Sequence, residues 1–233
     1  MAAAGADGEA DFGAGFDHPI FRESLRLIRV LPGTAAALAP LTPLQQDVVL
    51  RLIHSSGDPE LACAVRFAPG GCEAGLAALA AGAPILTDTA MAAAAVAPMA
   101  RRTFGNAVRS VLDWAPDQAP AGSTRTAAGM GAALAQLEQP AVVLIGSAPT
   151  ALEVLLDQTV AGTVQAPALV IGMPVGFVGV AESKRHLAAS GLAHIGLEGS
   201  KGGAGLVAAA CNALLRAGWC QAASAPSGPS SCS

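Results

Sequence analysis

The sequence contains no tyrosine, and aromatic residues make up only 3% of its 233 positions. Its hydrophobic core must therefore be built mainly from Ala, Leu, Val and Ile, packed at close quarters. Charged residues make up 13%, about half the share that is usual in globular proteins. A surface with so few charges has apolar area to cover, so we expect an oligomer.

Positive charge is also scarce, because the chain has only two lysines, Lys184 and Lys201, and a formal net charge of −4. It has no basic run and no alternation of basic and aromatic residues, which argues against a nucleic acid as partner. None of the five cysteines forms a C-x-x-C pair, and an odd number does not make a disulfide framework. We expect reduced thiols in a cytoplasmic protein and no bound metal.

Long hydrophobic segments are missing as well. The most extended apolar stretch, residues 168–181, is interrupted by Pro174 and by glycines and is too short to span a bilayer. The acidic N-terminus lacks the basic region of a secretory signal. We expect no membrane contact, a single domain over residues 16–218, and disordered ends at residues 1–15 and 219–233.

The first recognisable elements form an N-terminal helical segment. Apolar spacing predicts one helix over residues 20–31. Thr42 and Pro43 mark the start of a second helix, because Thr42 is a good N-cap and Gln45 completes a capping box. This second helix is predicted to end near residues 54–57.

From residue 84 onward, short apolar runs alternate with helical patterns. The runs predict strands at residues 84–88, 141–145, 168–171 and, more weakly, 194–197, and an ambiguous segment that favours a strand at 108–114. Helices are predicted from Met91, at 123–138, from Pro149, at 182–189 and at 205–217. This order predicts an α/β fold, a doubly wound and mostly parallel sheet with helices on both faces.

In such sheets, ligands bind at the carboxyl ends of the strands. Here those ends are residues 87–88, 146–149 and 172–176. Asp88 is therefore a candidate acid or base, or merely the cap of the next helix. His54, at the end of the second helix, is a candidate general acid or base near neutral pH, or a cation that stabilises the helix terminus.

Two further candidates are cationic. Arg125 is predicted at the start of a helix, where a cation opposes the helix dipole, so it either grips a carboxylate or is simply solvated. The glycine-rich loop at residues 199–205 either binds an anion with the help of Lys201 or lets a helix pack closely. It lacks the order of a phosphate loop, and the chain has no dinucleotide fingerprint. These residues indicate a ligand site above the sheet and leave the reaction open.

Several motifs, taken together, resemble the precorrin-8X methylmutase family and its cobalt-precorrin-8 relatives. They occur in the family's order between residues 18 and 215. The matching motifs are HPI (18–20), ES (23–24), IR (28–29), RLIHSSGD (51–58), GAPILTD (82–88) with Met91, TRTAA (124–128), IGSAPTAL (145–152), VIGMPVGFVGVAESK (170–184), GGAG (202–205) and NAL (212–214).

The resemblance implies an isomerase of cobalamin biosynthesis that moves a methyl group from C11 to C12 of precorrin-8X, giving hydrogenobyrinate, or acts on the cobalt form. It implies no cofactor and a homodimer with active sites at the subunit interface. The family's catalytic histidine falls on His54 and its motif arginine on Arg125, while Ser24 matches a position near the site. Because the substrate carries many carboxylates, Arg125, Lys184 and Lys201 become candidate anchors, with Asp88 as a further binding candidate.

A methyl shift of this kind needs a delivered proton and a rigid pocket, so one histidine suffices. The sequence departs from the family at Ser147, where the family often has Asn. In the glycine-rich loop at residues 199–205, where the family usually has more arginine, the only basic residue is Lys201. Two other functions stay open: a non-catalytic corrinoid-binding protein, or a nicotinamide-dependent oxidoreductase. A methyltransferase is also conceivable from the substrate.

Overall fold

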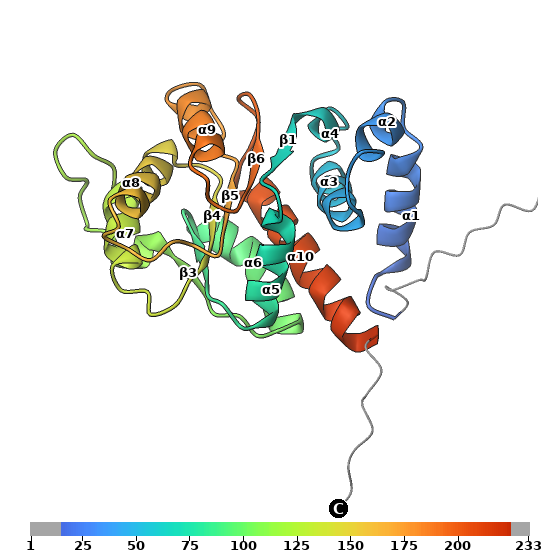
Figure 1. Ribbon diagram of the computed structural model, residues 1–233, viewed down its shortest axis with the longest axis horizontal. Helices are drawn as coiled ribbons and strands as arrows, with labels where there is room; N and C mark the ends of the chain where they lie inside the picture. The colour runs from blue at the N-terminus through green and yellow to red at the C-terminus, as the bar shows by residue number, and fades with distance from the viewer. Residues whose placement is uncertain (1–14, 225–233) are drawn as a thin grey trace, which may run out of the picture.

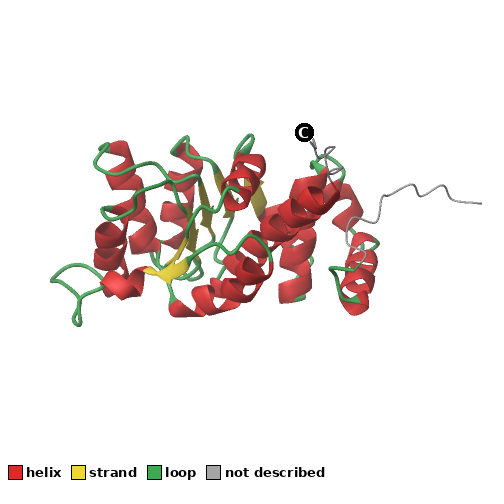
Figure 2. Ribbon diagram, turned by 90° about the horizontal axis from the view of Figure 1, so that it is seen from below, coloured by secondary structure: helices red, strands yellow, loops and turns green. Residues whose placement is uncertain are grey.

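The computed structural model describes residues 15–224, and these form a six-stranded sheet with helices on both faces (Figures 1 and 2). The strand order is β1-β6-β5-β4-β2-β3. All pairs are parallel except β1 with β6, which is antiparallel. The strands are β1 (Val65–Phe67), β2 (Ile85–Thr87), β3 (Val108–Ser110), β4 (Val142–Ile145), β5 (Leu169–Gly172) and β6 (His194–Leu197).

Alternate residues of the central strands enter two separate hydrophobic clusters, one on each face of the sheet. Val142 and Leu144 join the cluster of α5 (Gly71–Ala80), α6 (Ala90–Arg102) and α10 (Ala204–Ser224). Val143 and Ile145 join the cluster of α7 (Arg125–Leu134), α8 (Pro149–Val160) and α9 (Val180–Ala189). A strand that is buried on both faces has to be apolar throughout, and this confirms the predicted doubly wound fold.

The N-terminal segment is helical, as predicted, and packs beside the sheet domain. It consists of α1 (Pro19–Arg29), α2 (Thr34–Leu38), α3 (Pro43–Ser56) and α4 (Leu61–Ala64). The capping box is present, because Thr42 Oγ1 accepts from the Gln45 N–H at 3.3 Å and Gln45 Oε1 accepts from the Thr42 N–H at 3.0 Å. Gly57 ends α3 in the left-handed conformation. Helix α3 packs mainly against α10.

Several elements differ from the sequence prediction. The sequence predicts no strand at β1, which is only three residues long and lies at the sheet edge. The segment 108–114 is a strand only to Ser110 and continues as the 3₁₀ helix η1 (Val111–Trp114).

The C-terminal boundary also needs correction. Helix α10 continues to Ser224, because Cys220 is buried and Trp219 packs edge-on against Phe104, with ring centroids 5.6 Å apart. The remaining predicted ends, residues 1–14 and 225–233, lie outside the described residues. Among the helices that are described, none is both long and apolar enough to cross a membrane.

Candidate active site

His54 and Ser24 meet where α1 crosses the last turn of α3. Ser24 Oγ lies 2.7 Å from His54 Nδ1, and the His54 side chain is exposed. If the Ser24 hydroxyl donates to Nδ1, the ring proton of the neutral imidazole resides on Nε2. In protonated His54 the direction reverses and Nδ1–H donates to Ser24 Oγ, so in either form Nε2–H is free to face a bound molecule.

Aromatic and cationic side chains surround the other side of the imidazole. The Phe21 ring lies edge-on to His54, with centroids 5.0 Å apart, and the Arg51 guanidinium stacks on Phe21 at 4.7 Å. Partial burial, and then the positive charge of Arg51, lower the pKa of His54 below its ordinary value. His54 is therefore a stronger acid than an exposed histidine whenever it is protonated.

A second cation, Arg216 of α10, anchors the same corner of the molecule. It forms a bidentate ion pair with Asp17, and its guanidinium lies 3.5 Å from the Asp47 carboxylate on α3. Asp17 and Arg216 are largely buried, so this pair ties the segment before α1 to the C-terminal helix. The position of Ser24 relative to His54 thus depends on contacts with α10.

An open groove of about 420 Å³ begins directly after His54. It lies beyond the carboxyl ends of β5 and β6, and of the three strand ends named from the sequence only residues 172–176 line it, through Val175. Its walls come from the end of α3, the loop after β5 and the loop before α10, and the lining residues are Ser55, Ser56, Asp58, Leu61, Val175, Lys201, Gly202, Gly205 and Leu206.

Glycines allow the loops below this groove to stack without side chains between them. A Cβ atom on Gly202 would lie 2.0 Å from the Met173 carbonyl oxygen, and one on Gly146 would lie 2.6 Å from the Gly203 carbonyl carbon. Neither backbone can move aside easily, since Gly203 N–H donates to Met173 O at 2.9 Å. Close packing is therefore one role of the glycine-rich loop.

Asp88 is fully buried at the end of β2. Its Oδ2 accepts from the backbone N–H groups of Gly146, Ser147 and Ala148 at 3.0, 2.6 and 2.9 Å, while Oδ1 has no hydrogen-bond partner among the described residues. Burial raises the pKa of Asp88 and the three N–H donors oppose that rise. Asp88 does not cap the helix that follows it, because the N-cap of α6 is Thr89. It holds the start of α8 instead.

Lys184 contacts the loop before α10 from α9, whereas Lys201 belongs to that loop. Lys184, almost buried on α9, donates from Nζ to the carbonyl oxygens of Gly199 and Lys201, both at 2.7 Å. Lys201 Nζ bridges the carboxylates of Asp58 and Glu60, both at 2.6 Å. Lys201 therefore connects this loop to the residues that follow α3.

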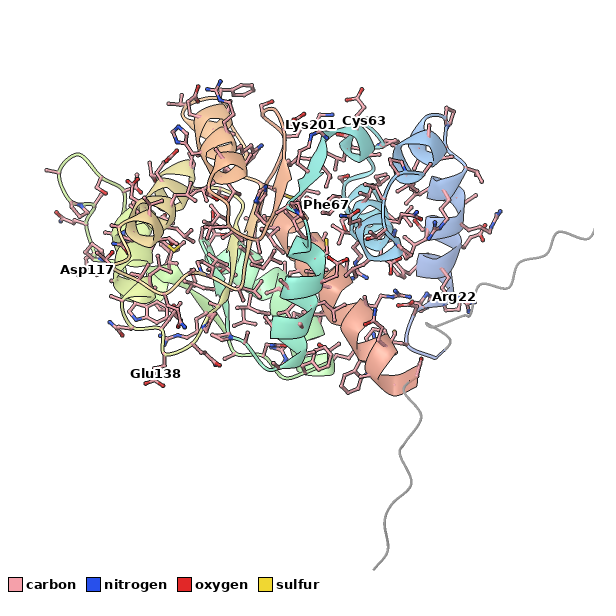
Figure 3. All side chains as sticks on the ribbon, viewed as in Figure 1. Arg22, Cys63, Phe67, Asp117, Glu138 and Lys201 are labelled. Atoms are coloured by element: carbon pink, nitrogen blue, oxygen red, sulfur yellow. The ribbon has the colours of Figure 1, made fainter. Side chains whose placement is uncertain are left out.

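Arg125 lies far from His54 within one chain. It is the first residue of α7, and its Nε donates to the Pro116 carbonyl at 2.8 Å. Helices α7 and α3 are on opposite sides of the molecule, as are Asp117 and Arg22 of α1 in the view with side chains (Figures 1 and 3). The structure thus brings Ser24 and His54 together, with Lys201 across the adjacent groove, but leaves Arg125 apart.

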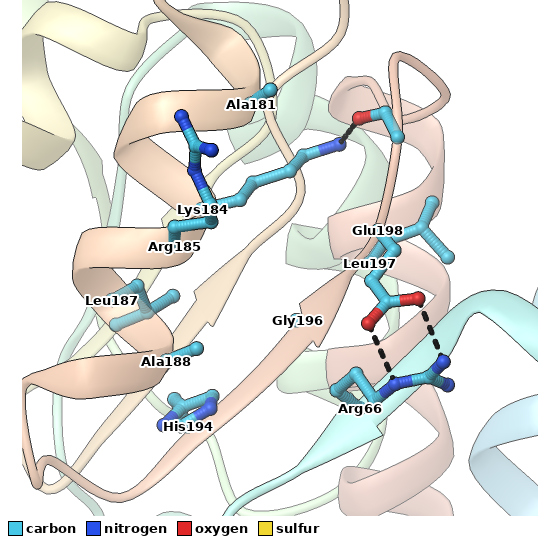
Figure 4. Close-up of a pocket in the computed structure, with 11 residues that line it drawn as sticks. Arg66, Ala181, Lys184, Arg185, Leu187, Ala188, His194, Gly196, Leu197 and Glu198 are labelled. Atoms are coloured by element: carbon cyan, nitrogen blue, oxygen red, sulfur yellow. Dashed lines mark hydrogen bonds and ion pairs between the residues drawn. The ribbon is translucent and has the colours of Figure 1, made fainter.

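A second groove lies between α9 and β6 (Figure 4) and has a volume of about 320 Å³. Arg66 and Glu198 form a bidentate ion pair across its mouth, with N–O distances of 2.9 and 2.7 Å. This groove shares no lining residue with the groove beside His54. Both Lys184 and Gly199, in the loop before α10, line this second groove.

Comparison with known proteins identifies the family. The family model described as precorrin-8X methylmutase matches residues 19–217. Precorrin-8X methylmutase of Pseudomonas aeruginosa is 42% identical over 200 residues, covering 84% of this chain and 93% of that protein. The chain belongs to the precorrin-8X methylmutase family.

Other relatives carry both names of the family. Cobalt-precorrin-8 methylmutase of Synechocystis is 36% identical over 217 residues, covering 87% of this chain and 97% of that protein. The solved structure of precorrin-8X methylmutase from Thermus thermophilus has a TM-score of 0.75 at 39% identity, covering 85% of this chain and 95% of that one. These matches confirm the resemblance found in the sequence and, with it, an isomerase of cobalamin biosynthesis.

Sequence reasoning missed the residues that surround the predicted ones. Phe21 contacts the His54 ring, Arg51 acts on His54 through its charge, and Asp58 and Glu60 bind Lys201. Arg51 lies one helical turn before His54, which was an available signal for proximity. The Lys201 contacts span more than 140 positions and had no such signal. Residues 15–224 contain no cluster of three or more His, Cys, Asp or Glu side chains suited to a metal.

Proposed function

We propose that this chain catalyses the migration of a methyl group from C11 to C12 of precorrin-8X, giving hydrogenobyrinate, or the same rearrangement of the cobalt-containing ring. The observation that carries the proposal is the Ser24–His54 pair at the mouth of an open groove in a chain of this family. His54 is the proposed general acid.

The proposed mechanism requires one proton and a fixed ring. Protonated His54 donates its Nε2 proton to the conjugated macrocycle, the bond from the methyl carbon to C11 breaks, and a bond to C12 forms. The proton then returns to the imidazole, so substrate and product have the same composition. Ser24 holds the imidazole in one orientation, which is the contribution that positioning makes to such a reaction.

Carboxylates of the substrate need cationic partners, and we assign these to Lys201 and Arg125. Lys201 already binds Asp58 and Glu60, so a substrate carboxylate would replace one of these acids at the ammonium. Backbone N–H groups at the start of α10 supply further donors beside it. Asp88 contributes indirectly, because it fixes the turn that carries Ser147.

Two observations support a homodimer with active sites at the interface. The loop after β5 exposes Phe177 at 92% and Val178 at 89%, and Met91 at the same edge of the sheet is 71% exposed. Apolar side chains as exposed as these favour contact with another chain. Arg125 lies apart from His54 in one chain, so a second copy would bring its own α7 to complete the site.

The test is an anaerobic absorption spectrum recorded with purified protein and precorrin-8X alone, and in parallel with cobalt-precorrin-8. We expect the bands of one or both substrates to shift with time, since the rearrangement changes the conjugation. His54→Ala should slow the shift by about 100-fold or more. His186→Ala, which removes an exposed histidine paired with Glu153 on α8, is the matched control and should leave the rate unchanged.

The outcomes separate the competing functions. Binding of hydrogenobyrinate with no turnover of either substrate would establish a corrinoid-binding protein instead. A rate that depends on added S-adenosylmethionine or NAD(P)H would replace the isomerase with a methyltransferase or an oxidoreductase.

A further inference from the structure

Lys184 is a cation without an anion. Its side chain is 8% exposed, and the ammonium donates to two neutral carbonyl oxygens, those of Gly199 and Lys201. Among residues 15–224, no carboxylate lies within ion-pair distance of Nζ. Burial of a lysine with such partners is costly, so the contact is expected to have a specific purpose. We refer to this ammonium and the two carbonyls as the lysine clasp.

The charged groups around the clasp are engaged elsewhere. On the strand side Glu198 is bound by Arg66, and on the same helix Arg185 is bound by Glu182 at 3.1 Å. On the loop side Lys201 is bound by Asp58 and Glu60. His194, at the far end of the groove in Figure 4, is bonded through Nδ1 to the Leu192 carbonyl at 2.9 Å. Because these groups are bound to other partners, the attraction between the Lys184 ammonium and the two carbonyl oxygens depends on the charge of Lys184 itself.

The loop that the clasp holds forms one wall of the groove beside His54. Gly202 packs against Met173, and Ser200 O accepts from the Gly176 N–H at 3.1 Å. The Lys201 side chain then reaches Asp58, four residues after His54. The backbone from residue 199 to residue 203 is thus held by Lys184 of α9 on one side. On its other side, Lys201 faces the proposed substrate.

We propose that Lys184 is a positioning residue: its charged ammonium holds the loop at residues 199–203 in the conformation that presents Lys201 and the start of α10 to the substrate. This inference rests on the proposed function for its ligand. It replaces the expectation that Lys184 binds the substrate directly, because the ammonium of this buried residue is already bonded to two backbone carbonyls. Substrate affinity should then require the charged form of Lys184.

The charge of Lys184 is lost at mildly alkaline pH. Burial lowers its pKa to about 8. The protonated clasp is thus complete at pH 7 and largely lost at pH 9. Affinity for a corrinoid should weaken by about tenfold between these two values. His54 is already neutral over this range because its pKa is lowered below its ordinary value. The pH dependence of the dissociation constant therefore reports on Lys184, whereas that of the turnover rate would also report on His54.

The experiment measures the dissociation constant of hydrogenobyrinate from pH 7 to pH 9.5 by its absorption spectrum. The wild-type chain should show the tenfold weakening. Lys184→Met, which keeps the length and removes the charge, should bind weakly at pH 7 and show no pH step. Lys201→Met should weaken binding but keep the step, and Arg185→Met, one residue along the same helix, should behave as wild type.

Amide hydrogen exchange of residues 199–203 gives a readout independent of any ligand. Exchange, corrected for its intrinsic pH dependence, should be faster in wild type at pH 9 than at pH 7, and fast at both values in Lys184→Met. A flat affinity and flat exchange in wild type would overturn the clasp, as would wild-type affinity in Lys184→Met. Absence of corrinoid binding at pH 7 would instead overturn the proposed function. In that case the hydrogen exchange of residues 199–203 would still test the clasp.

Discussion

Ser24 Oγ and His54 Nδ1 lie 2.7 Å apart, although the two residues are separated by 30 positions and belong to different helices. This hydrogen bond occupies Nδ1, so it selects the tautomer of the neutral imidazole and leaves Nε2 as the nitrogen that can face a bound molecule. In the proposed mechanism, the pair therefore combines the general acid with the residue that orients it.

Removal of the Ser24 hydroxyl should impair turnover while leaving the fold intact. Ser24→Ala deletes one hydrogen bond worth about 1 kcal/mol, so kcat should fall by about fivefold. Ring nitrogen chemical shifts of His54, measured by NMR, should show a mixture of tautomers. Ser24→Thr, which retains the hydroxyl, is the control; equal loss in both variants would mean that packing, not the hydrogen bond, is responsible.

The activity should have an acid optimum set by His54. A general acid must be protonated, so kcat/KM should fall as the pH rises through the pKa of His54. That pKa lies below its ordinary value because of burial and the Arg51 charge. Arg51→Met should move the fall to higher pH, as measured by the pH profile and by NMR titration of the ring. Arg109→Met, which removes a cation stacked on Trp114, should not move it.

The buried Asp88 carboxylate should be essential for stability. Asp88→Ala leaves three backbone N–H groups at the start of α8 without their acceptor, which should cost about 2–4 kcal/mol of unfolding free energy in a urea titration. Asp113→Ala removes a half-exposed carboxylate paired with Arg109 and should change stability by about 0.5 kcal/mol or less. Similar losses in both variants would contradict this role.

The exposed loop after β5 should hold two copies together. Phe177→Asp places a charge on a side chain that is 92% exposed, so it should not unfold the monomer, yet it should convert a dimer into monomers in sedimentation analysis. Activity should fall with dimer content. Val160→Asp, at an 81% exposed site at the end of α8, is the control. A Phe177→Asp protein that stays dimeric would show that the interface lies elsewhere.

Local signals account for the parts of the fold that the sequence predicted. The capping box at Thr42 and Gln45 involves neighbours in the chain, and the runs at β4 and β5 are apolar because both faces are covered. In contrast, β1 is recognisable only through its pairing with β6, more than 120 positions away.

The site shows the same division between local and distant information. The sequence places His54 at a helix end. In contrast, Asp88 accepts hydrogen bonds from the turn after β4 and Lys184 donates to two carbonyls, and these partners are backbone atoms distant in the chain. A sequence reveals which side chains can bind an anion, but not which of them are already bonded to other groups of the protein.

Helix α10 has a consequence for the order in which the molecule is completed. His54 and Ser24 are encoded early, but α3 buries its apolar face on α10, and Asp17 is anchored by Arg216 of that helix. During synthesis, α3 and Asp17 can make these contacts only after α10 has left the ribosome. The Ser24–His54 pair therefore gains its support only once α10 has been synthesised, and chains that terminate before Arg216 should emerge with the histidine unsupported.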